Sequence, residues 1–245
     1  MLDGTWHSLF PFVEGRTPVY GALSDRTVQS LGKLLGYVHR VGSQVSPDSY
    51  RTIPLWNKQE FLFELIELQS ILERRAYSKH PVDPRVAENL KRKETFVRSN
   101  SIAPHDIPLV FDTLIHCDFI YQNTFVDEQG EITHIYDFEK TSYAPRAYEL
   151  ARSLLINCFD DGWEEKNFVQ GRLFLAVYRD VYPIDLETFY HGVRMYLIHC
   201  AHMIWLDVRH IMTEYERSMQ IYLSHARRVS HVGDDHLAFC KKLYR

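Results

Sequence analysis

Apolar residues recur at intervals of three and four through most of the chain, and this spacing predicts a mainly helical protein. The first such stretch begins after Ser24, a residue typical of helix N-caps, and ends near Gly42. Two more helices are expected over about 56–77 and 83–98, the second opening with an N-cap residue followed by proline. Beyond the middle of the chain the same spacing predicts four further helices, over about 145–157, 163–181, 186–211 and 214–229.

Strand patterns are confined to two places. Short strands are expected over 109–115, 123–127 and 131–138, and the turn sequence 127–130 joins the last two into a hairpin. Near the N-terminus, the apolar stretch 8–13 contains a proline and predicts an edge strand or an extended linker. The expected fold class is therefore α+β, with many helices around a small β element.

Composition and charge narrow the function classes. The chain of 245 residues is 45% hydrophobic and 24% charged, which is typical of a folded globular protein. A net charge of -4 provides no general attraction to nucleic acid, and no apolar stretch is long enough to span a membrane. Asp3 and the lack of a basic start argue against a signal peptide, so we expect a cytoplasmic protein with neither nucleic acid nor membrane as a partner. The cysteines are far apart in the sequence and are expected to be unpaired: Cys117, Cys158, Cys200 and Cys240.

Three oxygen-bearing side chains gather around the predicted hairpin. Asp118 and Asn123 are five residues apart in a loop with apolar flanks, and Asp137 ends the hairpin that starts at Asn123. Because a hairpin returns the chain to its starting point, all three side chains can face one cavity. Magnesium prefers such oxygen ligands, and phosphoryl transfer needs a further carboxylate to accept the proton of the attacking hydroxyl. The spacing H-x-D-x-x-x-x-N followed by D-F is that of a kinase catalytic loop and its metal-binding aspartate.

The segment His116–Ala151 resembles the aminoglycoside phosphotransferase and choline-kinase-like family, which has a protein-kinase-like fold. In order, it carries H-C-D-F-I-Y-Q-N, a hairpin with D-E-Q-G, the segment Y-D-F-E and a helix start P-R-A-Y-E-L-A. The first motif alone is weak evidence, but the ordered set is specific, and the resemblance extends from about Phe10 to the C-terminal helices. It implies the C-terminal helical lobe of a kinase-like protein, with the site on a small β-hairpin.

The resemblance also implies roles for single residues. Asp118 would be the catalytic base, while Asn123 and Asp137 would hold Mg²⁺. His116 would brace the catalytic loop. Glu149, at a position that is usually aspartate in the family, would tie the following helix to that loop. The family's hinge, whose backbone receives the adenine of ATP, is matched by Phe10, Pro11, Phe12 and Val13.

This alignment leaves little room for a nucleotide-covering lobe. Residues 1–18 are expected to be a remnant of its last strand and the hinge, and residues 19–245 the C-terminal lobe. The glycine-rich loop and the strand lysine of the family would then lie upstream of Met1. Three explanations stay open: an internal start within a complete kinase, a degenerate member that binds without catalysing, or a site completed by another chain. The apolar hinge edge 9–13 would offer a surface for a homodimer.

The function hypothesis is ATP-dependent transfer of the γ-phosphate to a hydroxyl of an amine-bearing metabolite or antibiotic. The alternative is a catalytically inactive, truncated kinase-like binding or scaffold module. A hydrolase acting on polynucleotides is disfavoured because the chain is acidic and carries no basic stripe. The acceptor itself cannot be inferred from these motifs, since one fold serves many alcohols.

Four acidic residues are candidates for contact with a cationic acceptor: Glu139, Asp160, Asp161 and Glu164. Capping of the helix that starts near residue 163 is the alternative explanation for the last three. His199 and His202 are three residues apart on an expected helix and could bind zinc, but ordinary buried or hydrogen-bonded histidines are favoured. The tryptophans are expected to belong mostly to the core, among them Trp56, Trp163 and Trp205.

Overall fold

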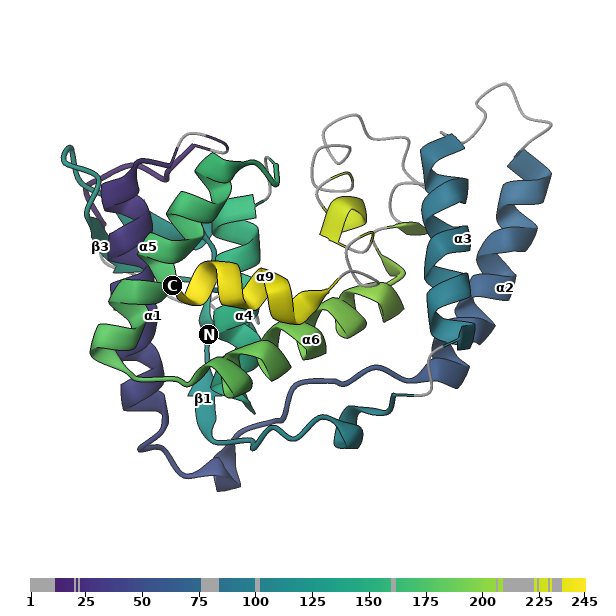
Figure 1. Cartoon of the computed structure of the whole chain (residues 1–245), viewed down its shortest axis with the longest axis horizontal. Helices are drawn as coiled ribbons and strands as arrows, with labels where there is room; N and C mark the ends of the chain where they lie inside the picture. The colour runs from purple at the N-terminus through teal and green to yellow at the C-terminus, as the bar shows by residue number, and fades with distance from the viewer. Residues whose placement is uncertain are drawn as a thin grey trace, which may run out of the picture.

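The computed structural model describes residues 12–19, 21, 23–75, 84–99, 102–159, 162–205, 207–208, 223, 225–228, 230 and 235–245. Two bodies of helices are visible in Figure 1, where α2 and α3 form a pair at one end and the other labelled helices form a larger group. The helices of the larger group are α1 (Asp25–Gly42), α4 (Arg146–Phe159), α5 (Glu165–Val181), α6 (Leu186–His202) and α9 (His236–Tyr244). The pair consists of α2 (Lys58–Arg75) and α3 (Pro84–Ser99).

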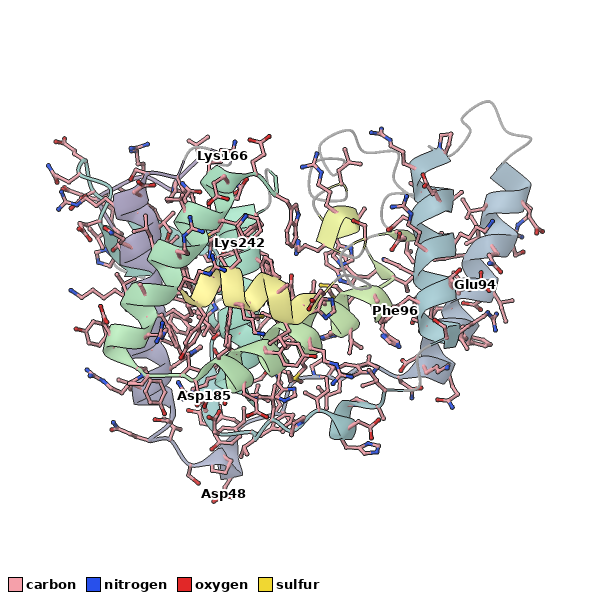
Figure 2. All side chains as sticks on the ribbon, viewed as in Figure 1. Asp48, Glu94, Phe96, Lys166, Asp185 and Lys242 are labelled. Atoms are coloured by element: carbon pink, nitrogen blue, oxygen red, sulfur yellow. The ribbon has the colours of Figure 1, made fainter. Side chains whose placement is uncertain are left out.

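The helices over 25–42, 58–75, 84–99, 146–159 and 165–181 confirm the sequence-based expectations closely. The expected helix 186–211 is interrupted. Met203 has extended backbone angles and caps α6 immediately after His202, and the chain is helical again at Trp205, Asp207 and Val208. Helix α9 was not predicted. It packs beside α5, where Lys242 lies 2.9 Å from the carboxylate of Glu165 (Figure 2).

Two small antiparallel sheets stand between the helices. β1 (Thr113–Ile115) pairs with β4 (Ser142–Ala144), and β2 (Thr124–Val126) pairs with β3 (Ile132–Ile135). The second sheet is the predicted hairpin. Of the first sheet only β1 was predicted. β4 was missed, because it has three residues and pairs with a strand that lies far back along the chain. The strand expected over 109–115 is confined to its last three residues.

The segment 12–19 lies along the hairpin. The backbone N–H of Arg16 donates to the carbonyl of Val126 at 3.1 Å, and the reverse bond measures 2.9 Å. The paired residue thus lies beyond the stretch 8–13, where an edge strand or an extended linker was expected. Residues 8–11 are outside the described part, and the described remainder of that stretch has no regular structure.

Helix α1 holds the larger group together. Its N-cap Ser24 accepts a hydrogen bond from the backbone N–H of Thr27, as the sequence predicted. Gly32 allows α1 to lie directly against α5, because a Cβ there would come within 2.4 Å of the carbonyl oxygen of Phe174. Gly42 does the same at the other end, where a Cβ would come within 2.1 Å of the carbonyl oxygen of Leu114. Close backbone approach therefore fixes α1 against both α5 and β1.

The α2–α3 pair has its own apolar cluster, formed by Phe61, Leu65, Leu68, Val86, Leu90, Val97 and Ile204. A polar contact also joins the two helices, since Gln69 donates to Glu94 at 3.0 Å (Glu94 is labelled in Figure 2). Lys93 on α3 forms a fully buried ion pair with Asp207 and donates to the carbonyl of Met203 at 2.6 Å. This buried lysine fastens the pair to the segment that follows α6.

The expectation of unpaired thiols is confirmed, since all four cysteines are free and three of them are buried. Over the part of the chain that the structure describes, no helix combines the length and the apolar character needed to cross a bilayer. The division at residues 18 and 19 stays a prediction.

Candidate active site

The backbone brings the three predicted site residues together. Asp118 follows β1, and Asn123 ends a short 3₁₀ turn (Tyr121–Asn123) that leads into β2. The side-chain amide of Asn123 donates to the backbone oxygen of Asp118 at 2.9 Å. The backbone oxygen of Asn123 in turn accepts from the N–H of Tyr136 at 3.1 Å, and Asp137 is the next residue. The loop after β1 and the turn after β3 therefore meet at one place.

The carboxylate of Asp118 is the best-held group of this site. The residue is 8% exposed, and two cations contact it. Arg152 Nη2 lies 2.5 Å from its Oδ1, and Lys140 Nζ lies 2.8 Å from its Oδ2. Burial acts to raise the pKa of Asp118, but the charges and hydrogen bonds of Arg152 and Lys140 outweigh it and hold the pKa below its ordinary value. Asp118 is therefore ionised at neutral pH, with each oxygen facing a cation.

Asp137 and Asn123 offer two oxygen ligands to a metal ion. Asp137 has a left-handed backbone with φ of 69°, a conformation in which aspartate is enriched, and it is exposed. Asn123 uses its amide nitrogen on Asp118, and its amide oxygen accepts no hydrogen bond from a described residue. One carboxylate and one amide oxygen, completed by phosphate oxygens and water, fit a hard cation such as Mg²⁺. In the described ranges no three His, Cys, Asp or Glu side chains gather into a metal cluster.

His116 spans the loop and the strand end. Its Nε2 donates to the carbonyl of Tyr136 at 2.9 Å, and its Nδ1 accepts from the backbone N–H of Asp118 at 3.2 Å. The ring is 1% exposed and lies against Phe138, with ring centroids 4.6 Å apart. A bracing residue would make these contacts, and the role assigned to His116 stays a prediction.

Glu149 connects the same loop to three helices. It is fully buried near the start of α4, and its Oε2 accepts from the backbone N–H of His116 at 3.0 Å. The same oxygen lies 2.9 Å from Nε2 of His39 on α1. Nδ1 of His39 is in turn 2.9 Å from the hydroxyl of Tyr178 on α5. Sequence analysis expected a tie from Glu149 to the loop, and it missed the His39–Tyr178 extension.

Sequence analysis also missed both cations on Asp118. Arg152 follows Glu149 by three residues, so one helical turn points both side chains toward the loop. That spacing could have revealed Arg152. Lys140 ends the 3₁₀ turn Phe138–Lys140 that follows Asp137, and nothing in the motif pointed to it.

The other predicted residues lie at or beyond the margin of this site. The side chain of Glu139 is exposed, and its backbone oxygen accepts from Arg51 at 2.6 Å. Glu164 occupies the N-cap position of α5, in line with the capping alternative. Phe12 is 93% exposed and Val13 is half-buried. Four of the predicted residues lie outside the described part of the chain: Phe10, Pro11, Asp160 and Asp161.

A cavity of about 610 Å³ opens between α2 and the end of α6. Three carboxylates from α2 line it, those of Glu60, Glu64 and Glu67, and none of them forms an ion pair with a described residue. Aromatic side chains also line it, including Trp56, Phe61 and Trp205. Trp205 is 53% exposed, so the expectation that it belongs to the core is wrong: it lies just beyond the end of α6, at the cavity wall.

The cavity wall is linked to the Asp118 site through α4. His199 lines the cavity, and its Nδ1 lies 2.8 Å from the hydroxyl of Tyr148, a residue of α4. Burial, together with the nearby His202 and the charge of Arg152, lowers the pKa of His199 to about 4, so its ring is neutral at neutral pH. Nδ1 of His202 donates to the carbonyl of Ile198 at 2.8 Å. These contacts favour the ordinary structural explanation of the two histidines over a zinc site.

Comparison with solved structures shows the fold. An aminoglycoside phosphotransferase from Alicyclobacillus acidocaldarius aligns with a TM-score of 0.53 and 15% identity, over 94% of this chain and 69% of that one. An ethanolamine kinase from Plasmodium vivax aligns with a TM-score of 0.51 and 17% identity, over 94% of this chain and 65% of that one. The fold is that of the protein-kinase-like proteins, as the sequence predicted.

Comparison with curated proteins gives no significant match. The sequence profile of the phosphotransferase enzyme family, however, matches residues 4–183. The matched range contains Asp118, Asn123, Asp137 and both cations on Asp118. The chain therefore belongs to the phosphotransferase enzyme family.

Proposed function

We propose that this protein transfers the γ-phosphate of ATP to a hydroxyl of a small, amine-bearing metabolite or antibiotic. The observation that carries this proposal is the ionised carboxylate of Asp118, held by two cations beside Asn123 and Asp137. Family membership supports phosphoryl transfer in general. The nucleotide and the acceptor are inferred from the residues at the site.

Asp118 would act on the acceptor hydroxyl. Its Oδ2 faces the half-exposed Lys140, so this oxygen is the one that a substrate can approach. Oδ1 is occupied by the more buried Arg152. A carboxylate with a lowered pKa is a weak base, and a weak base suits a loose transition state in which the hydroxyl proton leaves late. Asp118 would then mainly orient the hydroxyl and finally accept its proton.

The oxygens of Asn123 and Asp137 would hold the magnesium ion. Bound there, the ion would neutralise phosphate charge. The chain itself keeps the donors in place through two contacts. The amide of Asn123 is fixed on the backbone of Asp118, and His116 fixes the residue before Asp137.

The cavity beside α2 supports an amine on the acceptor. Carboxylates attract ammonium groups, and aromatic rings add cation–π attraction when such a group lies against them. The cavity combines both features, since Glu60 and Glu64 of α2 line it together with Trp56 and Trp205. Its link to Asp118 runs through His199, Tyr148 and Arg152, which all belong to α4 and α6.

The test is an acceptor-dependent phosphotransferase assay with ATP and Mg²⁺. The protein is incubated with a panel of amino alcohols, including ethanolamine, choline and aminoglycosides, and with neutral polyols. ADP formation and the phosphorylated acceptor are followed by mass spectrometry. We expect a phosphate ester on at least one amine-bearing acceptor. Binding of ATP without transfer to any acceptor would instead favour the catalytically inactive binding module.

Removing charge from the cavity should weaken acceptor binding selectively. In the double variant Glu60→Gln, Glu64→Gln we expect KM for the cationic acceptor to rise by about tenfold or more. The reason is that each ion pair at an exposed or half-buried carboxylate contributes about 1 kcal/mol to binding. The KM for ATP and kcat should change little. Steady-state kinetics with both substrates varied provide the measurement.

The matched control is Glu88→Gln, which removes an exposed carboxylate of α3 that is paired with Arg92 at 2.6 Å. It should leave all kinetic constants unaltered. An unchanged acceptor KM in the double variant would show that the amine binds elsewhere.

A further inference from the structure

Two cationic side chains contact the carboxylate of Asp118, and they differ in exposure and in conformational freedom. The Arg152 side chain is 19% exposed and comes from the interior of α4, where Tyr148 and Tyr196 lie close to its charge. The Lys140 side chain is 53% exposed and ends a turn of only three residues. Arg152 is therefore a fixed partner, while Lys140 can move without disturbing a helix.

The two cations contact different oxygens of the carboxylate. Arg152 contacts Oδ1 at 2.5 Å, and this charged hydrogen bond orients Asp118 from a side chain of α4. The acceptor hydroxyl needs the other oxygen, Oδ2, which Lys140 covers at 2.8 Å. Movement of Lys140 away from Oδ2 would therefore open this oxygen fully to a hydroxyl.

The new partner of Lys140 has to be an anion near the same turn. Lys140 lies three residues after Asp137, at the end of the turn that Asp137 opens. The backbone oxygen of the neighbouring Glu139 accepts a hydrogen bond from Arg51 at 2.6 Å, so Arg51 already has a partner beside this turn. Phosphates gathered at Asp137 and Asn123 would bring strong negative charge directly to this turn.

We propose that Lys140 is a further catalytic residue, whose ammonium group moves from Asp118 to the γ-phosphate of the bound nucleotide. This inference rests on the proposed function. A lysine suits the role because its ammonium is a compact charge on a flexible stem, and a cation placed on the transferred group stabilises the charge that develops there.

The step is balanced without any change in Lys140. The bond between the γ-phosphorus and the oxygen that bridges it to the β-phosphate breaks, and a bond forms from the same phosphorus to the acceptor oxygen. The hydroxyl proton passes to Oδ2 of Asp118, and ADP leaves. Lys140 remains protonated and serves only as a counter-charge, first to Asp118 and then to the phosphoryl group.

The test compares the affinities of ATP and ADP, which differ only by the γ-phosphate. Isothermal titration calorimetry with Mg²⁺ is carried out on the unaltered protein, Lys140→Met and Lys140→Arg. In Lys140→Met we expect the ATP-to-ADP affinity ratio to fall by about tenfold, the size of one charge-assisted contact, with ADP affinity unchanged. Lys140→Arg should keep most of the ratio.

Lys241→Met is the matched control, because Lys241 is an exposed lysine of α9 outside the site. It should bind both nucleotides like the unaltered protein. Thermal unfolding checks that each variant folds, and Lys140→Gln serves as a second neutral variant.

The outcomes separate this inference from the proposed function. If Lys140→Met and Lys140→Gln keep the ratio while ATP still binds, Lys140 only holds Asp118 and the inference is wrong, although the proposed function stands. If the unaltered protein binds neither nucleotide, both fail. A reduced ratio in the neutral variants alone supports the inference.

Discussion

We expect Asp118→Ala to remove nearly all acceptor phosphorylation while the protein stays folded. Removing a positioned general base typically lowers the rate by about 10²–10⁴-fold. Here the loss should reach the upper part of that range, because the same carboxylate also orients the hydroxyl. Product formation by mass spectrometry, under conditions in which the unaltered protein transfers phosphate, provides the measurement.

The fold should survive because the loop is fastened through the backbone of Asp118. Its N–H donates to Nδ1 of His116, and its carbonyl accepts from Asn123. The alanine variant does leave the buried Arg152 without its carboxylate, so Asp118→Asn is the companion variant. It keeps a hydrogen-bonding oxygen near Arg152 and removes only the charge and the basicity.

The control is Asp180→Ala, at an exposed aspartate of α5 away from the loop. It should retain full activity and the same unfolding temperature. If Asp118→Ala transferred phosphate at the normal rate while folded, the hydroxyl proton would have to go to another group, and the assignment of Asp118 would be withdrawn.

The parts of the site that are close in sequence could be predicted from it. Asp118, Asn123 and Asp137 are brought together by one short loop and one hairpin, and their spacing alone defines that geometry. Helical periodicity was equally sufficient for helices such as α1 and α5, because each buries a continuous apolar stripe. Local pattern and tertiary structure agree in these elements.

Contacts between distant segments could not be predicted in the same way. His39 and Glu149 are 110 residues apart in sequence, and no local pattern marks a histidine on α1 as the partner of a glutamate on α4. Lys93 would be assigned to the polar face of its helix, yet its side chain is fully buried because Asp207 meets it there. Such pairs depend on how the helices pack.

The largest effect on stability is expected for Glu149→Ala. Removing one member of a buried, charged hydrogen-bonded group typically lowers the free energy of unfolding by about 3–5 kcal/mol. Glu149 fits this case, since it is fully buried and its Oε2 serves both the N–H of His116 and the ring of His39. The variant leaves both donors without their acceptor. Urea unfolding followed by circular dichroism gives the free energy directly.

Glu187→Ala is the matched control, because Glu187 also lies in the first turn of a helix, α6, but its side chain is 86% exposed. It should leave the free energy of unfolding almost unchanged. Glu149→Gln retains one acceptor oxygen for the His116 N–H and should fall between the two. The two variants together show which contact of Glu149 matters. If Glu149→Ala and Glu149→Gln destabilise the protein equally, loss of the carboxylate charge opposite His39 dominates. If Glu149→Ala unfolds like the control, the contacts of Glu149 with the loop and with α1 do not stabilise the lobe.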